Sequence, residues 1–224
     1  MTGHEQTDSF YTRWAGVYEH LARQTPGIST LRTRTVEAMG LEPGATVIDM
    51  GCGPGPNFSF LRTTVGPTGT VIGIDLAAGA LPRAQRFVRS NDWTNVHPIR
   101  ADARHPPVRS ADAILATFVV GMFDDPVAAI DEWCNFVGPG GKIGLLHFAK
   151  SDGRYRFVMN RALEALVVVS TPGSNRRNRR SATLLDRRVR AAHDHLANRC
   201  TGVVRDTHWG GIIHRSTGTV AENP

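Results

Sequence analysis

The segment that most constrains the fold is residues 47–55, which read Val-Ile-Asp-Met-Gly-Cys-Gly-Pro-Gly. An apolar strand here runs into glycines at alternate positions, which let the backbone turn sharply and approach a ligand without Cβ clashes. The helix expected after the turn would direct its positive N-terminal dipole toward that ligand. The segment therefore predicts an α/β fold that binds a nucleotide-like molecule.

The spacing of the glycines restricts which nucleotide is bound. The dinucleotide pattern G-x-G-x-x-G would need a glycine at position 56, where the chain has Pro56, so a dehydrogenase is disfavoured. The pattern D-x-G-x-G-x-G that begins at Asp49 instead resembles motif I of the class I S-adenosylmethionine (SAM)-dependent methyltransferases. That resemblance implies that Asp49 helps to fix the ammonium group of SAM, while a tight turn without ligand is the alternative. It assigns these loop residues to the cofactor: Gly51, Cys52, Gly53 and Gly55.

A second acidic residue follows another short apolar run. Residues 71–75 read Val-Ile-Gly-Ile-Asp, so Asp75 would lie at the tip of a second strand. A carboxylate there can accept hydrogen bonds from both hydroxyls of a ribose. The alternative role for Asp75 is the N-cap of the next helix. Leu76, which follows it, belongs to the same predicted cofactor site.

Three further segments match the superfamily in order. Residues 96–103 lead an apolar strand into Asp102 and Ala103. The resemblance implies that Asp102 accepts a hydrogen bond from the exocyclic amine of adenine and that the backbone of Ala103 contacts a ring nitrogen, while a surface-loop acid is the alternative. Residues 111–117 resemble the superfamily's fourth strand, and residues 137–146 resemble the turn before its fifth.

The alternation of strand-like and helical segments predicts a Rossmann-like, doubly wound sheet with helices on both faces. We expect strands near residues 46–50, 70–75, 96–101, 112–117 and 142–148. We expect helices near residues 28–40, 56–64, 77–90, 126–136, 154–169 and 181–199. Residues 201–208 and 211–217 predict an antiparallel hairpin that closes a mostly parallel sheet. Ligands bind at the carboxyl ends of such strands, where these residues would lie: Asp49, Asp75, Asp102, Thr117 and His147.

The chain of 224 residues, 41% of them hydrophobic, is long enough to bury one sizeable core, so we expect a single domain over residues 1–224. Its expected parts are an aromatic lid (1–25), a SAM-binding core (26–150) and a basic C-terminal part (151–224). Neither a membrane-spanning run nor a signal peptide is evident, which predicts a cytoplasmic protein, with peripheral membrane contact left open. The three cysteines are widely spaced and predict free thiols and no metal site.

Positive charge is concentrated in the last third of the chain. Residues 1–150 carry 13 Lys+Arg against 14 Asp+Glu, and residues 151–224 carry 13 against 6. Four arginines follow the loop-like residues 171–174, and they are Arg176, Arg177, Arg179 and Arg180. They could meet an anionic membrane surface, an acidic substrate or RNA, or lie solvated in a loop. Residues 170–200 contain no Phe, Trp or Tyr on which bases could stack, so nucleic acid is disfavoured.

Residues 10–19, Phe-Tyr-Thr-Arg-Trp-Ala-Gly-Val-Tyr-Glu, resemble the start of the ubiquinone/menaquinone-biosynthesis methyltransferases and of the related bacterial phosphatidylethanolamine N-methyltransferases. In those proteins the segment forms a lid over the site. The resemblance implies that Tyr11, Trp14 and Tyr18 line the pocket and exclude water. The same spacing also suits an amphipathic helix packed on the core.

The predicted acceptor side departs from that branch. Where the quinone-methylating enzymes carry Gly-Leu-Arg-Asn, residues 117–123 are apolar and contain Phe118 and Met122, which predicts contact with a lipophilic acceptor; core packing explains them equally well. A phenol or carbon acceptor would need a base, for which His147 is the best-placed candidate, and an amine would need none. Weaker candidates for the base are Tyr18, His208 and His214.

These patterns together predict an enzyme that transfers a methyl group from SAM to a small, lipophilic, quinol-like or phospholipid-like acceptor and releases S-adenosylhomocysteine (SAH). Two alternatives stay open. One is an RNA or protein methyltransferase that uses the basic residues 176–180, and the other is a non-catalytic SAM-binding protein. The sequence leaves the oligomeric state open, including a homodimer.

Overall fold

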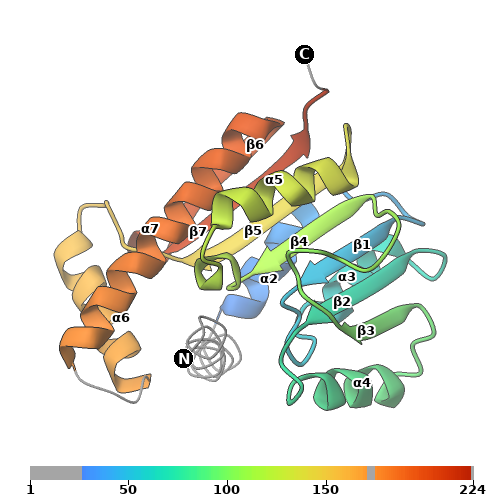
Figure 1. Ribbon diagram of the computed structural model, residues 1–224, viewed down its shortest axis with the longest axis horizontal. Helices are drawn as coiled ribbons and strands as arrows, with labels where there is room; N and C mark the ends of the chain where they lie inside the picture. The colour runs from blue at the N-terminus through green and yellow to red at the C-terminus, as the bar shows by residue number, and fades with distance from the viewer. Residues whose placement is uncertain (1–26, 171–174, 223–224) are drawn as a thin grey trace, which may run out of the picture.

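The computed structural model describes residues 27–170 and 175–222 and, of their side chains, those of 27–165 and 183–222. Seven strands form one sheet in the order β3-β2-β1-β4-β5-β7-β6 (Figure 1). They are β1 (Thr46–Met50), β2 (Thr70–Asp75), β3 (Val96–Arg100), β4 (Ala113–Thr117), β5 (Lys142–Phe148), β6 (Cys200–His208) and β7 (Ile213–Val220).

Strands β1 to β5 run parallel, whereas β7 runs antiparallel to both β5 and β6. The predicted fold class, with its antiparallel C-terminal hairpin, is therefore confirmed. The strand order reverses between β1 and β4, and ligands of doubly wound sheets bind at the carboxyl ends of the strands at such a point. A ligand-binding site is consequently expected at the residues around Asp49 and Thr117.

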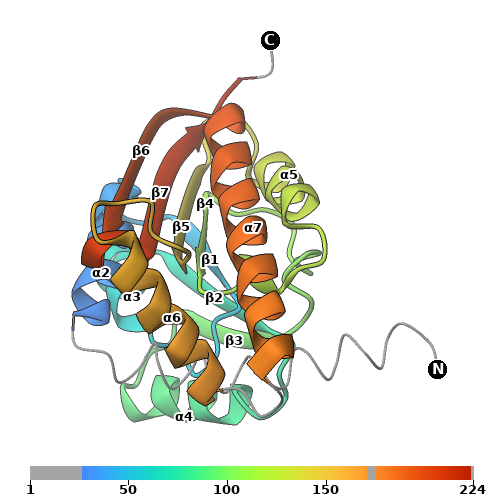
Figure 2. The ribbon, with the colours of Figure 1, turned by 90° about the vertical axis from the view of Figure 1, so that its left-hand side faces the viewer.

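The helices pack on the two faces of the sheet. They are α2 (Ile28–Ala38), α3 (Phe58–Val65), α4 (Leu81–Ser90), α5 (Pro126–Val137), α6 (Arg156–Ser170) and α7 (Asn175–Arg199), with short 3₁₀ turns η1 (Val120–Met122) and η2 (Trp209–Gly211). Figure 2 shows α5 and α7 on one side of the sheet and α2 and α3 on the other. Because strand side chains alternate, Ile48 and Ile114 pack with the α5 and α7 layer, whereas Val47 and Leu115 pack with α3.

Two helix starts differ from the predicted ones by four residues or more. Helix α4 begins at Leu81 instead of near residue 77, because the backbone N–H of Ala77 donates to Asp75 (2.7 Å) in a turn and Pro82 favours the first turn of a helix. Helix α7 begins at Asn175 instead of near residue 181, so the backbone of the arginine run is helical, consistent with the good helix propensity of Arg. The turn η1 was not predicted.

No helix among residues 27–170 and 175–222 is long and apolar enough to cross a membrane. The cysteines Cys52, Cys134 and Cys200 are all buried and unbridged. The predicted lid residues Tyr11, Trp14 and Tyr18 lie outside the described residues, and so do the side chains of residues 176–180.

Candidate cofactor and acceptor site

The glycine loop after β1 is shaped by three glycines with positive φ: Gly51, Gly53 and Gly55. A Cβ atom on Gly51 (φ +66°) would lie 2.6 Å from Cγ2 of Val119, so this glycine lets the loop pack against the turn after β4. A Cβ atom on Gly53 (φ +53°) would meet nothing within 4 Å. Cys52 between them is buried, and burial raises the pKa of its thiol. The loop is thus packed at Gly51 and leaves open space at Gly53.

Asp75 at the end of β2 holds this loop in place. Its Oδ2 accepts a hydrogen bond from the backbone N–H of Gly53 (2.8 Å), and its Oδ1 accepts one from that of Ala77. The alternative role as a helix cap is wrong, because the residue that precedes α4 is Ala80. Leu76 beside it is 42% exposed and offers apolar surface next to the carboxylate. The contact of Asp75 with a ribose stays a prediction.

Asp49 is fully buried at the switch point of the sheet. Its Oδ1 accepts a hydrogen bond from Nδ2 of Asn57 (2.8 Å), but its Oδ2 has no partner among the described residues. Burial raises the pKa of Asp49 to about 7, although the bond from Asn57 and the charge of Arg32 lower it. An unpaired buried acceptor costs about 1–3 kcal/mol. A cationic ammonium group, such as that of SAM, would supply the missing donor, so the site fits this end of the cofactor.

Arg32 of α2 completes this polar cluster, and sequence reasoning missed it. Its Nη1 donates to Oδ1 of Asn57 (2.5 Å) and to Oγ1 of Thr117 (2.8 Å), and its buried Nε has no partner among the described residues. Burial lowers the pKa of Arg32 to about 10. The signal was present, because Arg32 lies at helical spacing with the buried Ile28 and Thr35.

Asn57 was missed as well. It immediately precedes α3, where an asparagine would ordinarily cap the helix, yet its side chain makes no capping bond. It turns inward instead and also donates to Oγ1 of Thr117 (3.0 Å). Asn57 therefore links the ends of β1 and β4 across the switch point.

The predicted adenine-binding residues after β3 already have protein partners. Nε and Nη2 of Arg104 donate to Oδ1 (3.1 Å) and Oδ2 (2.6 Å) of Asp102, and these hydrogen bonds lower the pKa of that carboxyl. The carbonyl of Ala103 accepts a hydrogen bond from Nε1 of Trp133 (2.8 Å). An adenine would have to share Asp102 with Arg104, and this contact stays a prediction.

The turn after β4 contains the predicted acceptor residues Phe118 and Met122. Phe118 has a positive φ of 60°, which is uncommon for a bulky residue and marks a constrained turn. Its ring centroid lies 5.1 Å from Cζ of Arg32 and 4.9 Å from the ring centroid of Phe148. Met122 is buried in the core cluster. Both side chains pack within the protein, and their contact with an acceptor stays a prediction.

His147, the candidate base, is enclosed at the end of β5. Its Nε2 accepts a hydrogen bond from the backbone N–H of Val120 (3.2 Å), which places the proton of the neutral ring on Nδ1. Nδ1 lies 3.3 Å from Nε2 of His193, whose Nδ1 lies 2.7 Å from Oγ of Ser216. Burial lowers the pKa of His147 to about 3. The ring thus holds turn η1, and its role as a base stays a prediction.

The two weaker histidine candidates are also engaged. Nε2 of His208 lies 3.1 Å from Oδ1 of Asp206, and Nε2 of His214 lies 3.1 Å from the carbonyl oxygen of Gly211. Among the described residues, no group of His, Cys, Asp and Glu side chains is arranged to hold a metal ion.

Comparison with known proteins agrees with this geometry. Residues 47–141 match the family model described as "Methyltransferase domain". The chain is 28% identical to nocamycin O-methyltransferase of Saccharothrix syringae over 60% of its length, and 27% identical to demethylmenaquinone methyltransferase of a Geobacillus strain over 57%. It spans only 48% and 57% of these two relatives. The structure of a SAM-dependent methyltransferase from Aquifex aeolicus superposes with a TM-score of 0.57 at 15% identity, covering 88% of this chain and 94% of that one.

Residues 47–141 therefore match the methyltransferase domain family, and the chain has the fold of the class I SAM-dependent methyltransferases. These comparisons confirm the predicted superfamily and its cofactor, SAM. Demethylmenaquinone methyltransferases among the relatives agree with the branch that the sequence indicated.

Proposed function

We propose that this chain binds SAM at the carboxyl ends of β1 to β4 and transfers its methyl group to a small lipophilic acceptor. The observation that carries the proposal is the buried Oδ2 of Asp49, which has no partner among the described residues and lies at the end of the strand that leads into the glycine loop. A ligand that brings a cationic donor to this place removes the cost of the unpaired acceptor. Bound SAM would supply an electrophilic methyl group on a sulfonium.

The chain's own residues would bind and orient that cofactor. Asp49 would accept from the ammonium group, and the guanidinium of Arg32, held by Asn57, adds positive charge that suits the cofactor's carboxylate. Asp75 would hold the ribose while its bond to Gly53 keeps the loop in position. Methyl transfer is an in-line displacement, so alignment of this kind accounts for most of the acceleration that a protein can provide.

A lipophilic acceptor is supported by the turn that follows β4. Apart from Gly121, its side chains from position 118 to 123 are all apolar, and it lies against the glycine loop through Val119. The relatives named after nocamycin and demethylmenaquinone also point to small organic acceptors. The buried position of this turn would keep water from the reacting atoms.

The first test is calorimetric titration of the purified protein with SAM, SAH and NAD. We expect saturable binding of SAM and SAH and none of NAD. Binding of NAD without SAM would overturn the proposal.

The second test locates the transferred methyl group. We would incubate the protein with methyl-labelled SAM and three acceptor mixtures: lipophilic phenols and quinols, phosphatidylethanolamine, and RNA with protein. Label in an organic-soluble product is expected. Label in RNA or protein would show that the acceptor is a macromolecule and not a small lipophilic compound. SAM binding without label in any mixture would indicate a non-catalytic SAM-binding protein.

His147 as the base is tested separately with His147→Gln, which keeps an acceptor for Val120 without a titratable ring. If His147 is the base, the variant should show a changed pH profile of kcat and an unchanged KM. A lower thermal stability with an unaltered pH profile would assign His147 to holding turn η1.

A further inference from the structure

Helix α6 presents apolar side chains to solvent. Phe157 is 78% exposed, Val158 is 70% exposed, and Tyr155, just before the helix, is 62% exposed. They are the most exposed large hydrophobic side chains that the structure describes. Leu163, on the opposite face of α6, is buried in the core. The helix is therefore packed through Leu163 and leaves Phe157 and Val158 exposed, while the ring centroid of Tyr155 lies 5.8 Å from Cζ of Arg154.

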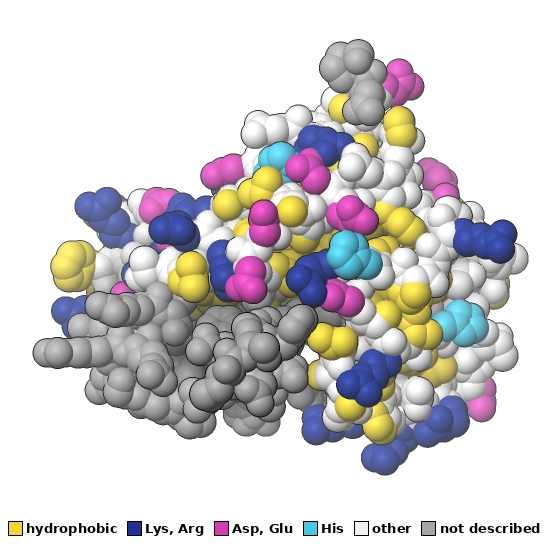
Figure 3. All heavy atoms as spheres, viewed as in Figure 1, with side chains coloured by type: hydrophobic (Ala, Val, Ile, Leu, Met, Phe, Trp, Pro, Cys, Tyr) yellow, Lys and Arg dark blue, Asp and Glu magenta, His cyan; other side chains and the backbone are white. Residues whose placement is uncertain are grey.

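Positive charge surrounds these apolar side chains. Three exposed arginines lie among them, and they are Arg154, Arg156 and Arg161. The neighbouring carboxylates are already engaged, since Asp152 pairs with Arg190 (2.6 Å) and Glu164 pairs with Lys150 (3.1 Å). None of the three arginines pairs with a carboxylate among the described residues. Figure 3 shows hydrophobic side chains at the left-hand end of the molecule with Lys and Arg side chains beside them.

We propose that residues 154–158 and Arg161, here called the α6 surface, dock on an anionic lipid bilayer. Aromatic and aliphatic side chains on an exposed helix face enter the boundary between head groups and acyl chains. Arginine guanidinium groups at the same depth contact the lipid phosphates. Phe157, Val158 and Arg161 lie on one side of α6 by helical spacing, and Arg154, Tyr155 and Arg156 lie at the start of the helix.

A second copy of the chain fits this surface less well. Self-contact would bring the arginines of two α6 surfaces face to face, and like charges across an interface are repulsive. The apolar part is also limited to Tyr155, Phe157 and Val158, whereas a stable interface buries about 800 Å² on each partner. An anionic bilayer can pair its phosphates with the arginines and bury the apolar side chains at the same time.

The position of α6 gives docking a direction. The helix follows β5 at the carboxyl edge of the sheet, the same edge that carries Asp49 and Thr117. A bilayer on the α6 surface would therefore lie near that edge, while α4 lies at the far end of the molecule (Figure 1). Docking is measured without SAM, so it stands or falls independently of the proposed function.

The test is co-sedimentation of the full chain with vesicles of phosphatidylcholine alone and of phosphatidylcholine with phosphatidylglycerol. With three arginines near the surface, we expect about a hundredfold tighter binding to the anionic vesicles. Phe157→Ser with Val158→Ser, and separately the change of all three arginines to Ala, should each weaken that binding by about tenfold or more.

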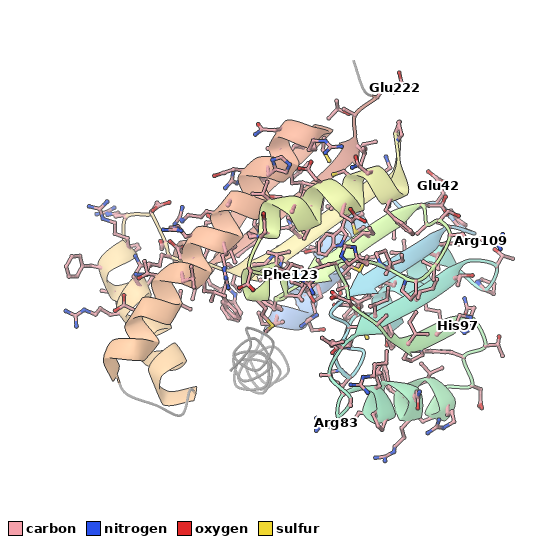
Figure 4. All side chains as sticks on the ribbon, viewed as in Figure 1. Glu42, Arg83, His97, Arg109, Phe123 and Glu222 are labelled. Atoms are coloured by element: carbon pink, nitrogen blue, oxygen red, sulfur yellow. The ribbon has the colours of Figure 1, made fainter. Side chains whose placement is uncertain are left out.

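The matched control changes three arginines at the other end of the molecule to Ala: Arg86, Arg89 and Arg109. Figure 4 labels Arg109 at the end opposite α6. The control should bind anionic vesicles like the wild type, and circular dichroism should show all variants folded. Equal binding of the control and the α6 variants to anionic vesicles, or no preference for them in the wild type, would overturn the proposal. If the wild type dimerises in analytical ultracentrifugation and Phe157→Ser with Val158→Ser abolishes the dimer, the partner of the α6 surface is a second copy of the chain and not a lipid bilayer.

Discussion

Asp49 and Arg32 bring opposite charges into the interior at the switch point of the sheet. They do not pair directly, because Asn57 lies between them and bonds to both. Burial moves each pKa toward the neutral form, and Asp49 responds most, with a pKa of about 7. The acid is consequently divided between its charged and neutral forms near neutral pH until a cation binds beside it.

SAM affinity should therefore depend on pH through Asp49. The ammonium group favours the ionised carboxyl, so binding releases a proton wherever Asp49 is protonated in the free protein. Affinity should rise by up to about tenfold per pH unit below pH 7 and level off above it. Calorimetry from about pH 5.5 to 8 tests this, and Asp49→Asn should flatten the curve. An equal slope in that variant would remove Asp49 from the ammonium site.

Asp75→Ala should weaken SAM binding by about 1–3 kcal/mol, because ribose hydroxyls would lose their acceptor. The loop would also lose the bond between Gly53 and Asp75, so calorimetry should be paired with thermal melting. Glu37→Ala, which removes an exposed carboxylate from α2, is the control and should bind normally. Wild-type affinity in Asp75→Ala would exclude Asp75 from the cofactor site.

Helices and strands were largely predictable, because each has a local signal. Alternating apolar runs located β1, β2 and β5 at their observed bounds. The predicted start of α7 near residue 181 is six residues late, because the helix already includes the arginines that follow residues 171–174, and Arg is a good helix former.

The site was only partly predictable for a related reason. Asp49 and Asp75 lie at the carboxyl ends of their strands in a recognised pattern, whereas Arg32 and Asn57 act through contacts that join positions distant in the sequence. His193, the neighbour of His147, comes from α7, and Ser216, the partner of His193, comes from β7; no sequence pattern pairs them with β5.

The glycine loop can be tested as an element with a matched pair of variants. Gly53 and Gly40 have similar backbone conformations, φ +53° and +60°, and a Cβ on either meets nothing within 4 Å. Gly53→Val should lower SAM affinity by about tenfold or more, because a β-branched side chain would fill the open space and strain the turn. Gly40→Val, beyond α2, should carry similar strain without loss of affinity. Equal calorimetric affinities for the two variants would contradict the loop assignment.

The molecule as a whole is joined by a buried chain of polar side chains. His147, His193 and Ser216 connect β5, α7 and β7 by hydrogen bonds. Burial lowers the pKa of both histidines, so both rings are neutral in the folded protein. The unfolded chain, in contrast, binds a proton on each below about pH 6.5.

Acidification should consequently reduce the free energy of unfolding. Between pH 6.5 and about 3, His147 is protonated in the unfolded state and neutral in the folded state. This difference lowers the free energy of unfolding by about 2 kcal/mol at about pH 5. Asp49 acts in the opposite direction, because its raised pKa lets the folded state bind an extra proton between pH 3.8 and about 7. Urea unfolding at about pH 7.5 and 5 should show a loss that is about 2 kcal/mol smaller in His147→Gln, in which Asp49 is unchanged. Identical losses in both proteins would refute a neutral His147.

The antiparallel pairing of β5 with β7 also has a consequence for biosynthesis. Strand β5 is complete at Phe148, but its partner begins only at Ile213. At roughly 5–20 residues per second, a ribosome needs several seconds to make the intervening chain. During that interval the nascent sheet has an apolar strand with an open hydrogen-bonding edge, the kind of edge that pairs with other chains. Slow translation between these two strands should therefore favour aggregation and make the newborn protein depend on chaperones.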